Sequence, residues 1–257
     1  MKSVTRRRWL RTPSAETDLA IWALPFVLSL VAGSTDIIGF LGLNGLFTAH
    51  ITGNIVVLAA HVVAGDPTVF AYMLSVPTFM VVLFLTRLLA GGLERFRVST
   101  LWPLLLLQLI LIGTFFVLCV TAGPWRDSDA MLAIIAGMFG VAAMAVQNAL
   151  VQISLRDSPT TAVMTTNVTH FLLDLGGVVI GGDPYNVAKA RNRAAHTLPV
   201  IVGFTIGCAL GAACDAVAGL WSLALPTGLA LLAFAMGFLV RESNSDKRCD
   251  VGPGQRR

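Results

Sequence analysis

Hydrophobic residues occur along this chain in long, nearly uninterrupted segments and not in the short alternating runs of a soluble domain. Eight apolar segments can be delimited, at residues 19–43, 50–64, 69–90, 101–121, 131–155, 163–180, 197–220 and 221–240. A helix needs about 20 residues to cross a hydrocarbon core of about 30 Å. The second and sixth segments are shorter than this, and both begin with polar residues. They are therefore weak candidates for full spans.

The positive charges distinguish eight crossings from six, because Lys and Arg gather in the cytoplasmic loops of membrane proteins. Eight crossings from a cytoplasmic amino terminus would place four basic residues outside, namely Arg87, Arg95, Arg97 and Arg156. Six crossings with two re-entrant half-helices place all of the 18 Lys and Arg residues except Arg126 inside. We therefore predict six spans, with both termini cytoplasmic. Full crossing of 50–64 and 163–180 through a locally thinned bilayer stays open.

Composition supports a membrane protein and argues against other classes. The chain is 56% hydrophobic and only 12% charged, whereas about a quarter of the residues in a soluble domain are charged. Its net charge of +4 lies at the chain ends and in gaps between apolar segments, so we expect no nucleic-acid partner. The four cysteines have no metal-ligand spacing, and catalytic motifs are absent. We expect no metal site, no cofactor and no enzymatic activity.

One polar phrase occurs twice in the chain. FTAHITGN at 47–54 aligns without a gap with TTAVMTTN at 160–167, at an offset of 113 residues. The same offset brings the polar cluster at 34–36 onto a second polar cluster at 147–149, each inside a long apolar segment. Composition does not explain the polar matches, so they indicate an internal repeat.

A proline match extends the repeat into the later part of each half. Pro77 corresponds to Pro199 at an offset of 122, and the nine extra residues fall in a basic connector, GGDPYNVAKARNRAAH at 181–196. Each half then holds three spans and one half-helix, and an odd number of spans inverts the second half relative to the first. We predict an all-α polytopic membrane protein with a 3+3 inverted repeat, repeat one at about 19–121 and repeat two at about 129–240.

These halves form a single transmembrane domain at 19–240. A basic cytoplasmic segment precedes it at 1–18, and a polar cytoplasmic tail follows at 241–257.

In this arrangement both half-helices begin near the middle of the membrane, where their unpaired N–H groups and positive dipole ends favour an anion or the carboxylate of a zwitterion. Residues able to cap these helix starts or to line the site form the predicted substrate site: Thr52, Gly53, Asn54, Thr165, Asn167, Gln147 and Asn148. The alternative is a capped break, or an interhelical amide contact, that serves packing only. Three ionisable residues are candidates for proton coupling: Asp36, His50 and His170.

The stretches GSTDIIGFLGLNGLFTAHITGN and QNALVQISLRDSPTTAVMTTN resemble the YoaK-like family of bacterial integral membrane proteins, a family of unknown function. The resemblance extends over about 19–240 and implies a six-span, multi-pass protein of the bacterial cytoplasmic (inner) membrane. The family motifs fall on Asp36, Thr52, Gly53 and Asn54, and on Gln147, Asn148, Ala149, Thr165 and Asn167. The chain departs from the pattern at Thr166, where the family often has glycine.

These features favour transport of a small anionic or zwitterionic solute by alternating access. The alternative is a non-transporting membrane protein, a sensor or assembly partner, in which the helix breaks are structural. Beyond the lipid bilayer and a small solute, the sequence names no partner. It leaves open the solute, the coupling ion and whether the chain forms a homo-oligomer.

Overall fold

The computed structural model describes residues 15–65, 69–122, 130–155 and 158–249, and every regular element within these ranges is helical. The elements are α1 (Ala15–Gly42), α2 (Ile51–Ala64), α3 (Val69–Arg95), α4 (Leu101–Ala122), α5 (Ala130–Ser154), α6 (Met164–Ile180), α7 (Pro184–Ala218), the 3₁₀ helix η2 (Gly219–Leu223) and α8 (Ala224–Cys249). The all-α class is confirmed. Most of the basic amino-terminal segment, and the tail beyond α8, lie outside the described residues.

Several helices are long and apolar enough to cross a membrane. Five such stretches are Ala23–Gly42, Val69–Arg95, Leu101–Thr121, Met131–Ser154 and Pro184–Phe238, the last of which runs through α7, η2 and α8. The chain is therefore a multi-pass membrane protein. With 14 and 17 residues, α2 and α6 are the two shortest α-helices of the described chain, in the places where the sequence has short apolar segments.

The largest difference from the sequence prediction lies at the start of α7. The apolar pattern begins at residue 197, yet the helix begins at Pro184 and includes most of the predicted basic connector. Proline is well suited to the first position of a helix, and the Ala, Lys and Arg residues that follow are strong helix formers. Hydropathy does not detect this segment because it contains three basic residues, Lys189, Arg191 and Arg193.

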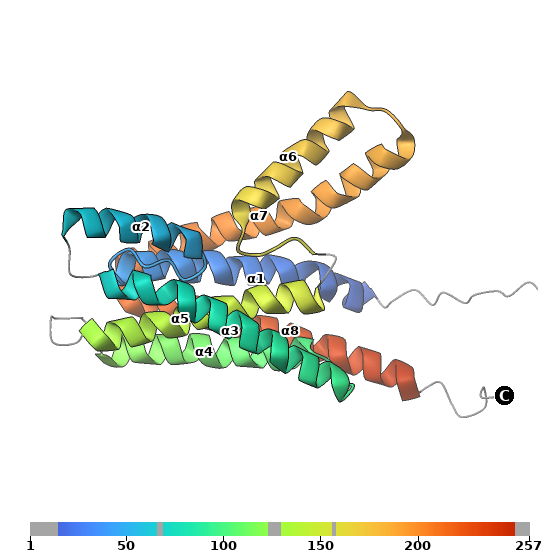
Figure 1. Ribbon diagram of the computed structural model, residues 1–257. Coiled ribbons are helices and arrows are strands. Elements are labelled where there is room, and N and C mark those ends of the chain that lie inside the picture. Colours follow the sequence, from blue (N-terminus) through green and yellow to red (C-terminus); the bar gives the residue numbers. More distant parts are fainter. Residues whose placement is uncertain (1–14, 66–68, 123–129, 156–157, 250–257) are drawn as a thin grey trace, which may run out of the picture.

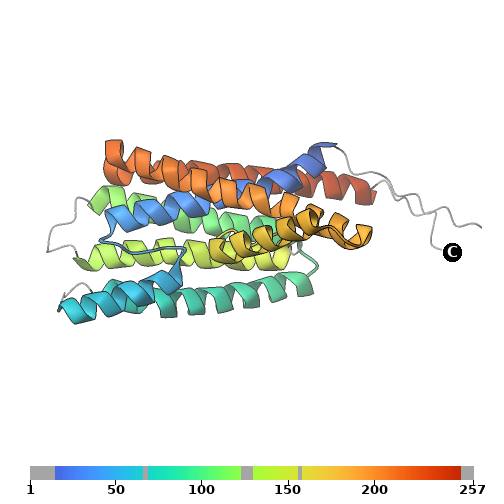
Figure 2. The same cartoon turned by 90° about the horizontal axis from the view of Figure 1, so that it is seen from above.

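The long helices lie side by side in a bundle (Figure 1). Figure 2 shows α2 and α3 on one side of this bundle and α7 and α8 on the opposite side, with α1 and α5 between them. In the contacts between helices, α1 packs against α7 and α8, whereas α5 packs against α3 and α4. The short helix α2 packs on α3, and α6 packs on α7. The second pair forms a hairpin that projects from the bundle (Figure 1).

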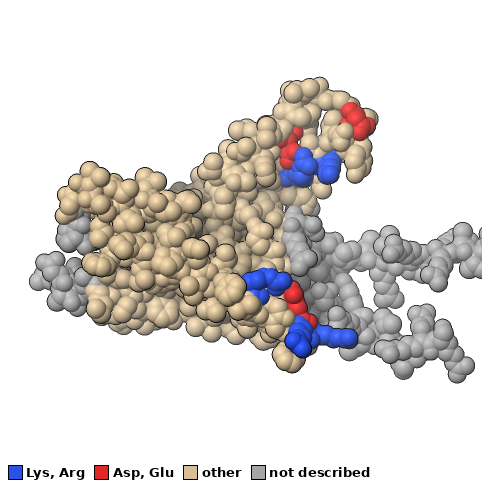
Figure 3. Space-filling model, viewed as in Figure 1, with Lys and Arg blue, Asp and Glu red and all other residues tan. Residues whose placement is uncertain are grey.

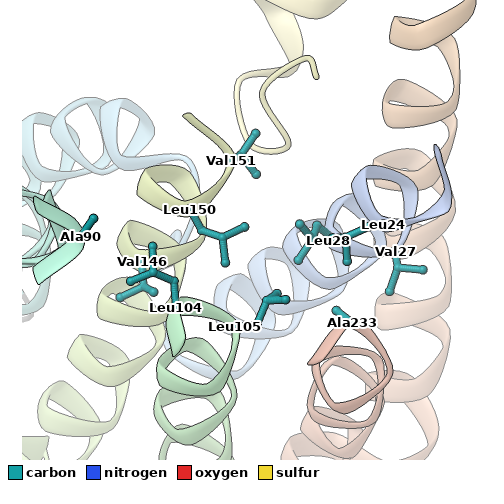
Figure 4. Packing of buried hydrophobic residues seen from close by; sticks show 10 residues of the cluster. All are labelled: Leu24, Val27, Leu28, Ala90, Leu104, Leu105, Val146, Leu150, Val151 and Ala233. Atoms are coloured by element: carbon teal, nitrogen blue, oxygen red, sulfur yellow. The ribbon is translucent and has the colours of Figure 1, made fainter. Parts of the chain in front are cut away.

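The core lies between the two central helices and α4 and α8. In Figure 4, Leu28 of α1, Leu105 of α4, Leu150 of α5 and Ala233 of α8 belong to one buried cluster. The most apolar windows of α1 and α5 are each 72% buried inside the protein, against 17% for α3. Since the exposed residues of α3 include many large hydrophobic side chains, such as Phe70, Phe84 and Leu88, its large exposed surface is suited to lipid.

Glycines allow α1 and α7 to approach closely. Gly203, Gly207 and Gly211 recur at every fourth residue of α7, a spacing that places them on one face. A Cβ atom added to Gly207 would lie 2.5 Å from the backbone oxygen of Leu30. Backbone atoms cannot rotate away as a side chain can, so the two helices are in contact through their main chains.

Gly207→Ala should therefore force α1 and α7 apart and lower the free energy of unfolding by about 1–3 kcal/mol, as overpacking does elsewhere. Thermal unfolding of the detergent-purified protein measures this as a lower melting temperature. Gly228→Ala in α8 is the matched control, because no atom lies within 4 Å of its added Cβ. An unchanged melting temperature for Gly207→Ala would contradict main-chain contact between these helices.

Candidate functional site

The chain between α1 and α2 is held by a buried carboxylate. Asp36 of α1 is 4% exposed, and its Oδ1 accepts the N–H groups of Thr48 at 2.9 Å and Ala49 at 2.7 Å. Its Oδ2 lies 2.6 Å from Nδ1 of His50, the residue that precedes α2. A carboxylate buried among apolar helices needs such donors. The structure thus brings together two residues predicted for proton coupling, a role that stays a prediction.

Asn54 also serves this connection. Its Oδ1 accepts the N–H of Phe47 at 2.9 Å, and its Nδ2 donates to the carbonyl oxygen of Phe47 at 2.7 Å and to Oγ of Ser75 at 3.0 Å. The side chain is fully buried. It therefore fixes the connection and also ties α2 to α3.

The second break repeats part of this pattern. Nδ2 of Asn167 donates to the carbonyl oxygen of Thr160 at 2.5 Å, again seven residues earlier in the chain. Asn54 and Asn167 thus make equivalent bonds at the offset of 113 found in the sequence.

The predicted capping of the two short helices is wrong. Their N-cap residues are His50 and Val163, and neither helix has a side-chain cap hydrogen bond. Because α2 begins at Ile51 and α6 at Met164, the two asparagines lie in the first turn and bond backward to the connection. The side-chain amides of the two asparagines thus bond to the preceding connections, and neither helix start has a side-chain cap.

The other predicted residues near the helix starts differ in accessibility. Thr52 and Thr165 are exposed in the first turns of α2 and α6. Gly53 faces the ring of Phe47, since a Cβ there would lie 3.0 Å from a ring carbon. A ligand can therefore approach either threonine more easily than the backbone of Gly53.

Gln147 links three parts of the bundle. Its Nε2 donates to the carbonyl oxygen of Leu28 at 2.9 Å and to Oγ1 of Thr161 at 2.8 Å. Its Oε1 accepts a hydrogen bond from Gln108 of α4 at 2.6 Å, and both amides are 1% exposed. Sequence reasoning missed Gln108, a single amide in a very apolar span. Asn148, by contrast, bonds within its own helix to the carbonyl of Met144.

A cavity of about 900 Å³ lies between α6, α7 and the connection that precedes α6. Two predicted site residues, Asn167 and His170, line it. The other lining residues are Ser158, Pro159, Thr160, Thr166, Leu173, Asp174, Lys189, Asn192, Arg193, His196 and Thr197. The α7 members were missed because they lie in the segment taken as a connector or at its border. Their spacing of three or four residues places them on one face of a helix.

Inside the cavity, Asp174 and Arg193 form an ion pair. Nε of Arg193 donates to both carboxylate oxygens, at 3.1 and 3.2 Å, and Nη2 donates to Oδ1. The Asp174 side chain is 9% exposed and that of Arg193 is 57% exposed. Lys189 forms no ion pair with any described residue. The described residues also contain no group of three potential metal ligands.

Comparison with known proteins agrees with this membrane architecture. A family model described as "Protein of unknown function (DUF1275)" matches residues 24–236. The UPF0700 transmembrane protein YoaK of Bacillus subtilis (strain 168) is 37% identical over 78 residues, which cover 30% of this chain and 33% of that protein. The match thus spans about a third of the relative's length. No solved structure matches the chain.

Replacing Asn54 should destabilise the first break. Asn54→Ala leaves the half-buried N–H and C=O of Phe47 without their partners, which costs about 1–3 kcal/mol. We expect a lower melting temperature in detergent than for the parent. Thr52→Ala, an exposed change two residues away, should leave the melting temperature unchanged. If both variants melted with the parent, the bonds of Asn54 would not hold the connection.

Proposed function

The chain belongs to the DUF1275 family, and we propose that it is a secondary transporter that moves a small anionic or zwitterionic solute by alternating access. The observation that carries the proposal is the polar cavity between α6 and α7, which reaches the helix break at Thr160 and Asn167. Its volume of about 900 Å³ is suited to a small molecule. Ionisable residues in a membrane domain are costly and usually serve function.

The helix contacts support the predicted inverted repeat. In the predicted repeat, α1, α2, α3 and α4 correspond in order to α5, α6, α7 and α8. When each helix is replaced by its counterpart, the contact of α1 with α7 becomes that of α5 with α3. The contact of α1 with α8 becomes that of α5 with α4. Likewise, the α2–α3 pair becomes the α6–α7 pair. An inverted repeat of three spans and one half-helix produces this exchange. We infer six spans, α1, α3, α4, α5, α7 and α8, with α2 and α6 re-entrant.

Charge supports an orientation. The Lys and Arg side chains visible in Figure 3 lie at one end of the bundle, on the α6–α7 hairpin and near the end of α3. By the positive-inside rule this end is cytoplasmic. The cavity lies on the same hairpin and would then open toward the cytoplasm.

The two halves differ in what fills the groove beside the half-helix. Phe47 covers the start of α2, and its counterpart at the offset of 113 is the smaller, polar Thr160. Ala71 of α3 corresponds to Arg193 of α7 at the offset of 122. At these two positions the side chains are thus apolar in the first half and polar in the second, where they line the cavity. We interpret this asymmetry as a state closed to the outside and open to the cytoplasm.

One hydrogen bond marks the difference between the closed and the open groove. Asn54 bonds to Ser75 and so joins α2 to α3. The counterparts Asn167 and Thr197 both line the cavity, and within the described chain Thr197 bonds instead to the carbonyl of Arg193. Closure of α6 onto α7 would allow Asn167 to bond to Thr197. The hairpin is therefore the moving element that we propose.

Proton coupling is assigned to Asp36 and His50. The pair joins α1 to the start of α2, and the His50 side chain is 35% exposed, so a proton can reach it. A change in its protonation would alter the bonds that hold the first break. His170, the third candidate, lines the cavity of the second half.

Blocking the cavity should stop transport. Thr166→Trp places a large ring in the cavity, whereas Val168→Trp, on an exposed part of the same helix that does not line the cavity, is the control. In proteoliposomes we expect the parent and Val168→Trp to take up at least one of labelled phosphate, succinate and glycine. Uptake by folded Thr166→Trp should fall to the level of empty liposomes.

Undiminished uptake by Thr166→Trp would remove the cavity from the transport path. Absence of uptake by the parent for all three solutes would favour a non-transporting sensor or assembly partner. One observation favours that alternative. At the first break, the side-chain amide of Asn54 is already hydrogen-bonded to the backbone N–H and C=O of Phe47.

A further inference from the structure

We propose that the cavity between α6 and α7 binds an oxyanion, the phosphate or carboxylate group of a small molecule, between Lys189 and Arg193. This inference rests on the proposed function and deepens it by naming the substrate class. The two cations are four residues apart on α7, so they project from the same face of the helix, and both line the cavity.

The charges in the cavity favour an anion. Lys189 and Arg193 outnumber the one carboxylate, Asp174, among the lining residues that the structure describes. Lys189 has no ion-pair partner in this part of the chain. Among the other lining residues, Asn192 of α7 supplies amide donors and Thr166 of α6 supplies a hydroxyl. An oxyanion with several acceptor oxygens can use an ammonium, a guanidinium and neutral donors together.

Asp174 positions Arg193 and is not free to attract a cation. Both of its oxygens accept hydrogen bonds from Nε of Arg193, and Oδ1 also accepts from Nη2. These bonds use one edge of the guanidinium and leave the donors of Nη1 for a ligand. A ligand ammonium or a metal ion would have to displace Arg193 from Asp174. An oxyanion needs no such displacement.

An unpartnered hydroxyl shows that the cavity has further bonding capacity. Oγ1 of Thr160 is buried and has no hydrogen-bond partner among the described residues, and Thr160 lines the cavity. Buried polar atoms are nearly always hydrogen-bonded in proteins. Because this atom has almost no accessible surface, a ligand in the cavity can supply the missing partner once the Thr160 hydroxyl turns toward the cavity.

The first test is binding of inorganic phosphate to the full chain in phosphatidylcholine nanodiscs. We expect sodium phosphate, compared with sodium chloride at equal ionic strength, to raise the melting temperature in a saturable manner. Lys189→Ala and Arg193→Ala should each weaken the apparent affinity about tenfold or more, because each removes a charged hydrogen-bond donor. Arg191→Ala removes the same charge from an exposed residue that does not line the cavity, and should bind phosphate like the parent.

Asp174→Asn separates a ligand site from a purely structural ion pair. The substitution keeps the shape of the side chain, removes the negative charge and weakens the bonds to Nε and Nη2 of Arg193, so phosphate should bind several-fold more tightly. If the pair served folding alone, the variant would be less stable and its response to phosphate would equal that of the parent or vanish.

Nanodiscs with phosphatidylglycerol distinguish a lipid headgroup from a soluble anion. Stabilisation by this lipid that requires Lys189 and Arg193, and that phosphate does not produce, would identify a lipid phosphate as the ligand of the oxyanion site. The proposal is overturned if neither phosphate nor the anionic lipid stabilises the parent. It is also overturned if the response survives in both Lys189→Ala and Arg193→Ala.

The outcome is separable from that of the proposed function. Saturable phosphate binding in a protein that takes up no solute would keep the oxyanion site and remove transport. Uptake of a solute that is unaffected by Lys189→Ala and Arg193→Ala would keep transport and remove this site.

Discussion

A backbone group that leaves a helix inside a hydrocarbon layer must find its hydrogen-bond partner within the protein, and this constraint governs the structure. Each half of the chain has one such break, before α2 and before α6. At both breaks an asparagine in the first turn of the short helix bonds to the carbonyl seven residues earlier. At the first break, the carboxylate of Asp36 takes up two further N–H groups. In the re-entrant arrangement proposed above, the short helices can therefore reverse direction without exposing backbone to lipid.

The two halves meet this constraint with different chemistry. Asp36 has Ala149 as its counterpart, and the ring of Phe47 has Thr160. The second half instead has an ion pair between α6 and α7, where Arg193 and Asp174 lie beside open space. Repeated geometry with unequal filling is the arrangement that alternating access requires, since one side must be closed while the other is open.

Much of the fold could be predicted from the sequence because apolar length determines which helices reach across a membrane. The offset of 113 residues also located both asparagines before their equivalent bonds were visible. The hydrogen-bond partners of these asparagines could not be predicted. A side chain in the first turn of a helix can either cap the helix or bond backward to the preceding connection, and only the tertiary structure decides between the two. Gln108, Lys189 and Arg193 were not predicted as site residues for a related reason. Hydropathy averages over a segment and does not show which face of a helix meets a cavity.

The most direct measurement of the central claim is access to the α6–α7 cavity from the two sides of the membrane. A single cysteine at Thr166, in a chain with Cys119, Cys208, Cys214 and Cys249 replaced, can be labelled with a membrane-impermeant maleimide. Alternating access predicts rapid labelling in inside-out vesicles and slower labelling from the outside in whole cells, because the cavity would open to each side in turn. If the cysteine were labelled from one side only, both with and without solute, alternating access would be contradicted.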